Sequence, residues 1–239
     1  MSLSNSIKFY KWHEYSKSLS LKILTLAISA DLVLILLHSI YYLPETSLLR
    51  LLASEIVVYP KALLITEDQG FAEVFQYIKE FWIALILLFG FWQRKNFLFM
   101  AWGLFFGYLL LDDSLGIHEK LGFRISERFN FQPAFNLRAL DFGEIIVSFA
   151  VCIFFLIIIS WNYNRSKSKD RQYSNILLFS LFALAIPGVA FDLVQIALVD
   201  NSFSSLVFEV LEDGGEHIVM SIILAFVYAI DWETLKMKI

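Results

Sequence analysis

The sequence predicts an all-α protein that crosses a membrane several times and forms a single domain. Hydrophobic residues occupy 58% of its 239 positions and charged residues only 18%, and the mean hydropathy is +0.65. A soluble domain of this length is far less apolar. The apolar runs are continuous and rich in Leu, Phe and Ile, and they lack the alternation of a membrane β-barrel. We therefore expect a bundle of transmembrane helices.

Six apolar segments are each long enough to cross a hydrocarbon core of roughly 30 Å as a helix. The domain is expected to span residues 1–239, with helices at 21–43, 71–93, 96–115, 137–161, 175–199 and 204–230. The first segment lacks a small-residue cleavage site, so it is expected to remain as a helix and not to be removed as a signal peptide. The outer loop 44–70 has no assigned role; we expect an interfacial helix over 48–58 within it, and a kink at Pro187-Gly188 in the fifth helix.

Lysine and arginine gather at the N-terminus, the second and fourth loops and the C-terminus, which share one side of a six-helix topology. The positive-inside rule makes that side cytoplasmic, so both termini are expected inside the cell. The third loop is an exception, because it carries Lys120, Arg124, Arg128 and Arg138 on the outer side. The single cysteine, Cys152, excludes an intrachain disulfide framework. A net charge of −4 without a basic stripe argues against a nucleic-acid partner.

The sixth segment is unusual because ionisable residues lead directly into its apolar run. Glu209, Glu212, Asp213, Glu216 and His217 precede the uncharged residues 218–230. At about 100° per residue these five side chains span an arc of about 140°, so one helix face can carry all of them. Each ionisable group at membrane depth costs roughly 2.5 to 3.5 kcal/mol, so such groups face the bundle interior and mark a pathway, a proton relay or a metal site.

Polar residues on all six helices are expected at one depth in the membrane. With about 1.5 Å of rise per residue, they lie about 20 to 27 Å above the cytoplasmic boundary, in the outer half of the bilayer. Besides the sixth-helix residues, they are His38, Glu80, Asp112, Glu144 and Asp192. The nearby basic residues Lys79, Lys120 and Arg138 are too few to neutralise these acids, so protons or metal ions are needed.

Carboxylates with a minority of imidazoles suit zinc, iron or manganese, and one or two divalent ions are expected. The predicted metal ligands are Asp112, His118, Glu119, Glu212, Asp213 and His217, and the predicted catalytic acids and bases are Glu144 and Glu216. The ligand count matches that of di-metal helical bundles, although their Glu-x-x-His pairs are missing. Ordinary explanations remain for some groups: acids at the start of a helix complement its dipole, and His38 fits a packing role.

Two short segments carry a resemblance to known proteins. Leu111-Asp112-Asp113 through His118-Glu119, together with Leu211 through His217, resembles uncharacterised bacterial multi-pass membrane proteins with an LDD-x4-HE stretch. This resemblance implies a bacterial cytoplasmic membrane and no established activity. The chain is more loosely similar to the alkaline ceramidase and adiponectin-receptor-like membrane hydrolases, which hold an intramembrane zinc near one leaflet. Those families use a His-x3-His pair where this chain has Asp213 and His217.

The leading hypothesis is a metal-dependent membrane enzyme, a hydrolase or an oxidase, that acts on a lipid or another membrane-soluble substrate. A transporter or channel for cations or protons could use the same acidic cavity. A third hypothesis is a structural subunit whose buried polar network fixes helix packing. The inner halves of the third, fourth and sixth helices are almost wholly apolar, which favours a dead-end site over a conduit. The sequence leaves open the substrate, the metal and the oligomeric state.

Overall fold

The computed structural model describes residues 3–42, 61–134, 137–185 and 202–230, with side chains described from Ser18 in the first range and from Leu206 in the last. Within these ranges the chain is helical and contains no strand. The predicted interfacial helix at 48–58, the kink at Pro187-Gly188 and Asp192 lie outside the described residues.

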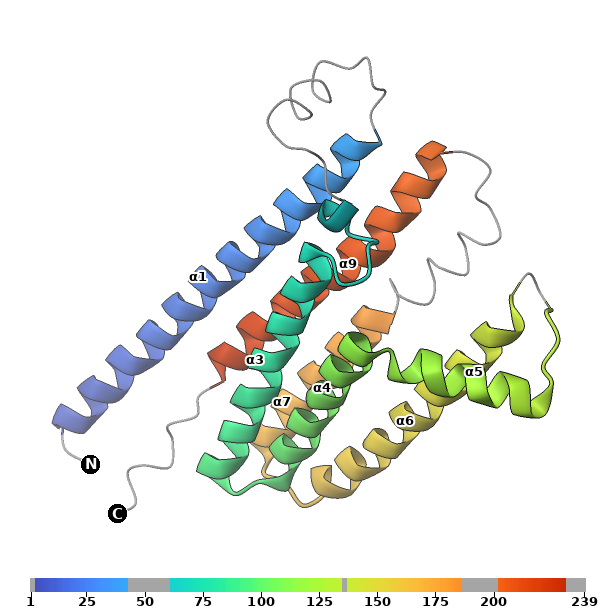
Figure 1. Ribbon diagram of the computed structural model, residues 1–239. Coiled ribbons are helices and arrows are strands. Elements are labelled where there is room, and N and C mark those ends of the chain that lie inside the picture. Colours follow the sequence, from blue (N-terminus) through green and yellow to red (C-terminus); the bar gives the residue numbers. More distant parts are fainter. Residues whose placement is uncertain (1–2, 43–60, 135–136, 186–201, 231–239) are drawn as a thin grey trace.

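The helices follow one another in long antiparallel passes (Figure 1). Their bounds are α1 Leu3–Tyr41, η1 Lys61–Leu63, α3 Phe71–Arg94, α4 Phe97–Leu115, α5 Ile117–Phe129, α6 Ala139–Tyr163, α7 Ser168–Ala185 and α9 Ser202–Ala229. The second, third, fourth and sixth predicted helices agree with α3, α4, α6 and α9 to within two residues at each end. α1 and α7 begin earlier than predicted, and α5 was not predicted.

Four of the described helices are long and apolar enough to cross a membrane: α1 over Ser18–Tyr41, α3, α4 and α6. Their outward faces carry large apolar side chains, as Leu26 at 75% and Phe149 at 66% exposure illustrate. Such surfaces suit lipid and not water, so the protein is a membrane protein. α9 is longer than α3, and its sequence contains four carboxylates where that of α3 contains two.

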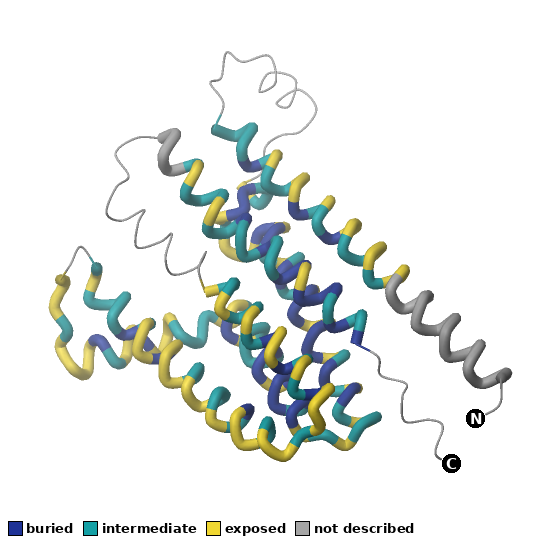
Figure 2. The backbone as a smooth tube through the Cα atoms, turned by 180° about the vertical axis from the view of Figure 1, so that it is seen from behind, coloured by how far each residue is buried: buried dark blue, intermediate teal, exposed yellow. Residues whose placement is uncertain are grey.

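The apolar core occupies one half of the bundle, around the turn that joins α3 to α4. It brings together Leu87 of α3, Trp102 and Phe106 of α4, and Met220 and Ile223 of α9, all fully or almost fully buried. Figure 2 shows buried segments where α3, α4 and α9 meet and exposed segments along the outward faces of the surrounding helices. Buried polar residues such as Asp31, Lys79, Glu80 and His217 lie outside this core.

The short helix α5 leaves the direction of the other helices and packs on α6 (Figure 1). Gly116 makes the turn possible, because its φ of 56° is a left-handed conformation that residues with a side chain rarely adopt. The contact between α5 and α6 requires glycine as well: a Cβ at Gly143 would lie 2.1 Å from the carbonyl oxygen of Gly122. This close approach fixes the start of α5, where His118 and Glu119 lie.

Candidate functional site

An acidic cavity of about 230 Å³ lies in the polar half of the bundle. Its lining comes from the segment before α3 and from α3, α4, α5 and α9: Ile65, Thr66, Glu67, Asp68, Glu73, Gln76, Asp113, His118, Glu119, Asp213, Glu216 and His217. Seven of these twelve side chains are carboxylates, two are imidazoles, and none is lysine or arginine. The described lining therefore provides many ligands for a cation and no built-in countercharge.

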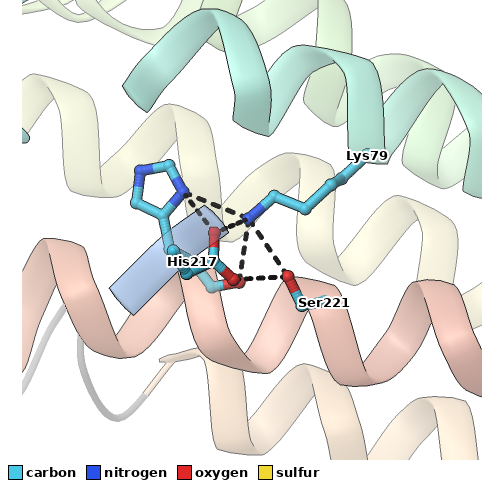
Figure 3. Close-up of polar contacts among 4 residues, drawn as sticks. Lys79, His217 and Ser221 are labelled. Atoms are coloured by element: carbon cyan, nitrogen blue, oxygen red, sulfur yellow. Dashed lines mark hydrogen bonds and ion pairs between the residues drawn. The ribbon is translucent and has the colours of Figure 1, made fainter. Parts of the chain in front are cut away.

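A buried lysine lies directly behind His217 (Figure 3). The Nζ atom of Lys79 is 3.0 Å from Oδ1 of Asp31, 3.1 Å from Nδ1 of His217 and 2.9 Å from the carbonyl oxygen of His217. Ser221 donates a hydrogen bond to Oδ2 of Asp31. Lys79, Asp31 and Ser221 are at most 1% exposed, so α1, α3 and α9 are joined here by a fully enclosed ion pair.

This arrangement sets the tautomer of His217. An ammonium group has donors only, so Nδ1 of His217 accepts a hydrogen bond from Lys79 and the ring proton resides on Nε2. Figure 3 shows that the second ring nitrogen lies on the side of the ring away from Lys79. Since His217 also lines the cavity, it supplies a hydrogen-bond donor that Lys79 holds in position, and it has no free lone pair for a metal.

A second imidazole, His118, is held by Asp112. Oδ1 of Asp112 accepts a hydrogen bond from the backbone N–H of His118 at 2.7 Å and lies 3.2 Å from Nδ1 of the ring. The hydrogen bond to Asp112 raises the pKa of His118 above its usual value. Asp112 itself is buried and does not line the cavity, so it orients His118 from behind.

Glu80, the residue after Lys79 on α3, extends the acidic cluster beneath the cavity lining. It is 1% exposed, and its carboxyl group lies beside that of Asp113 on α4 and near Glu216 on α9. Two adjacent carboxyl groups cannot both carry an uncompensated charge in a site of low dielectric. A proton or a cation must therefore be shared at this point.

Of the eight residues predicted as ligands or catalytic groups, five line the cavity together: His118, Glu119, Asp213, Glu216 and His217. Asp112 lies behind His118, and Glu144 lies on α6 near His118, where its backbone contacts Gly122 of α5. Glu212 lies on α9 outside the lining. Within the described part of the chain, no three His, Cys, Asp or Glu side chains converge closely enough to hold a metal ion.

The sequence reasoning did not select four lining acids, Glu67, Asp68, Glu73 and Asp113. Regular helix geometry directed Asp113 away from the site, and the turn before α3 has no helical periodicity that could place its acids. From the sequence, Lys79 is only a possible countercharge for the acids. A lysine within a helix of membrane-spanning length is the signal that could have identified it.

Another polar cluster has a packing role. The ring of buried His38 accepts a hydrogen bond at Nδ1 from the backbone N–H of Ile65, 3.4 Å away, and its Nε2 is 3.2 Å from Glu209. Tyr42 donates to the same carboxylate at 2.6 Å. These contacts attach the segment around η1, one wall of the cavity, to α1 and α9.

Comparison with known proteins identifies a family and no activity. Residues 21–232 match a family described as a domain of unknown function, DUF8692. No curated protein and no solved structure matches the chain.

Proposed function

The chain belongs to the DUF8692 family, and we propose that it is a six-helix membrane enzyme that binds a divalent cation in the acidic cavity and acts on a lipid or another membrane-soluble substrate. The observation that carries this proposal is the lining of seven carboxylates and two imidazoles without a lysine or arginine among the described lining residues. Such a lining needs cations or protons to be stable in low dielectric.

The arrangement of the helices supports an outward-facing site. α1 starts and α9 ends at the same end of the bundle, and the α3–α4 and α6–α7 turns lie there too (Figure 1). These turns carry Arg94, Lys95 and the basic residues of 165–171. By the positive-inside rule this end is cytoplasmic, so the acidic cavity opens on the outer side, and both termini are inside.

The chemistry of the lining favours a hydrated cation. Carboxylate oxygens with at most two imidazoles suit manganese or iron, with zinc as the alternative. Because three ligand side chains do not converge in the described residues, one or two carboxylates and several waters would complete the coordination of one or two ions. Asp213 and Glu119, from α9 and α5, are the acids we expect to bind such an ion.

Hydrogen-bond donation and proton transfer are assigned to neighbouring residues on α9. His217 is neutral and is held by Lys79, so its Nε2–H can donate a hydrogen bond to a bound substrate without giving up the proton. Glu216 lines the same cavity and can accept a proton. Glu144, near His118, is the second candidate base. Below Ser221 the described contacts are apolar, around Met220 and Ile223, so the site is better suited to a reaction than to a conduit.

Metal analysis of the purified full-length protein tests the proposal. After mild chelation and reloading with Mn²⁺, Fe²⁺ or Zn²⁺ in turn, we expect retention near one ion per chain, and at least a tenfold weaker affinity in Asp213→Asn and Glu119→Gln. The matched control is Glu127→Gln, because Glu127 is an exposed acid of α5 outside the cavity lining. A folded protein that retains none of these ions would overturn the proposal and favour protonated carboxylates.

The orientation has a separate test. In a Cys152→Ser background, a cysteine placed at Glu67 is expected to react with an impermeant thiol reagent added from the outer side only. A cysteine placed at Lys167 is the control and should react only from the cytoplasmic side. The reverse pattern would place the cavity on the inner side and contradict the topology.

A further inference from the structure

A second cavity, of about 450 Å³, lies at the opposite end of the bundle between the α3–α4 turn and the α6–α7 turn. Its lining contains five basic side chains and a single acidic one: Arg94, Lys95, Arg165, Lys167, Lys169 and Asp170. This balance is opposite to that of the acidic cavity. A hollow of this kind fits an anionic ligand.

The single acid of this cavity is already bound by its neighbours. Asp170 is 5% exposed, and it accepts hydrogen bonds from Nη1 of Arg94 at 2.5 Å and from Nδ2 of Asn96 at 2.9 Å. Ser166 in turn donates to Oδ1 of Asn96 at 3.0 Å. These contacts join the two turns into a rigid frame. Lys95, Arg165 and Lys167 are exposed lining residues, so basic side chains outnumber this acid at the surface of the cavity.

Two exposed tryptophans place these cations at the level of lipid headgroups. The guanidinium of Arg165 lies 4.6 Å from the ring centre of Trp161, and Nζ of Lys95 lies 5.9 Å from that of Trp92. Trp161 is 63% exposed and Trp92 is 71% exposed, each near the end of an apolar helix. Tryptophan in such a position is typical of the boundary between hydrocarbon and headgroups.

A shallow and largely open apolar groove of about 430 Å³ follows one face of α6. It is lined by Ile153, Leu156, Ile157 and Trp161, with Ser160 and Asn164 near its end. Trp161 belongs to the groove and Arg165 to the basic cavity, and their stacked contact joins the two hollows. A ligand with an anionic head and an apolar tail matches this order of a basic cavity followed by an apolar groove.

We infer that this end of the protein binds one anionic phospholipid, with the phosphate group in the basic cavity and an acyl chain along the α6 groove. Arg165 provides paired donors that suit a phosphate, and Lys95 and Lys167 add point charges. The helix α7 begins at Ser168, and Lys169 and Asp170 of its first turn line the same cavity. The inference is independent of the cation proposed for the acidic cavity.

Native mass spectrometry of the delipidated full-length protein in detergent tests the inference. Phosphatidylglycerol is expected to bind with a one-to-one stoichiometry and at least tenfold more tightly than phosphatidylcholine. The double variant Lys95→Gln/Arg165→Gln should lose most of this preference. Its matched control, Arg124→Gln/Arg128→Gln, removes the same charge from exposed residues of α5 and should bind like the natural protein.

Two further measurements distinguish binding of a phospholipid from binding of a soluble anion and from non-specific electrostatic attraction. Ile153→Trp, which fills the apolar groove, should weaken binding of phosphatidylglycerol and leave the weak binding of glycerol 3-phosphate unchanged. Competition by glycerol 3-phosphate or inorganic phosphate as strong as that by the lipid would overturn the inference in favour of a soluble anion. Equal binding of both lipids, or equal loss in both double variants, would overturn it as well; circular dichroism and gel filtration verify that each variant is folded.

Discussion

The two ends of the bundle contrast in charge although the same helices build both. The cavity at one end is lined by seven carboxylates and no lysine or arginine among the described residues, whereas the cavity at the other end has five basic side chains and one carboxylate. The apolar core around Trp102 and Leu87 lies between them. The helix α3 extends from one cavity to the other, with Glu73 near its start and Arg94 at its end.

Each end also contains a buried ion pair, and the two pairs differ in their surroundings. Arg94 and Asp170 join two turns beside a cavity that contains further cations. Lys79 and Asp31 join three helices and are enclosed on all sides, with His217 as their link to the acidic cavity. The Arg94–Asp170 pair therefore frames a cavity, whereas the Lys79–Asp31 pair orients His217, a residue that lines one.

The largest expected effect comes from removing Lys79. Lys79→Met leaves Asp31 buried without its cation, so we expect a loss of about 3 to 5 kcal/mol in the free energy of unfolding. The double variant Lys79→Met/Asp31→Leu should recover most of it, because no unpaired charge remains. Thermal unfolding in detergent measures both, with Arg128→Met as the control for loss of an exposed cation. A double variant as unstable as the single one would show that the pair itself stabilises the bundle.

A change at Gly143 should affect the acidic end alone. A Cβ at Gly143 would lie 2.1 Å from the carbonyl oxygen of Gly122, so Gly143→Ala must separate α5 from α6 at a cost of about 1 to 3 kcal/mol. His118 and Glu119 would shift with α5 and weaken cation binding. The matched control is Gly107→Ala, whose Cβ meets nothing within 4 Å and which should not destabilise α4. If Gly143→Ala is destabilised but its cation affinity is unchanged, the position of α5 does not affect cation binding.

The smallest effect is a pH dependence in the metal-free protein. The hydrogen bond to Asp112 raises the pKa of His118 in the folded state. The resulting stabilisation is fully present below the unfolded-state pKa of about 6.5 and is lost as the pH rises through the higher folded value. Asp112→Asn keeps an acceptor for the backbone N–H of His118 and removes only the charge. The variant should therefore be less stable by roughly 1 kcal/mol or less at pH 5 and equal to the natural protein at pH 9.

Several features of the candidate site could be anticipated from the chain alone. The apolar segments required membrane-length helices, and the spacing of Asp213, Glu216 and His217 required a common face of α9. A constant rise per residue then placed the acids of different helices at a similar depth. This reasoning selected five of the residues that line the cavity.

Contacts between helices decided the rest. The charged sequence after Gly116 is too polar to cross a membrane, and it forms α5 where Gly122 approaches Gly143 of α6. The membrane depth of a residue and its helix face likewise could not reveal that Lys79 contacts His217 and Asp31. These contacts depend on how α1, α3 and α9 are rotated toward one another. The sequence by itself determined the length and polarity of α3, α4, α6 and α9, because these depend on local composition. Only the tertiary structure decided which charges meet, because the rotation and approach of packed helices are set by side chains far apart in the chain.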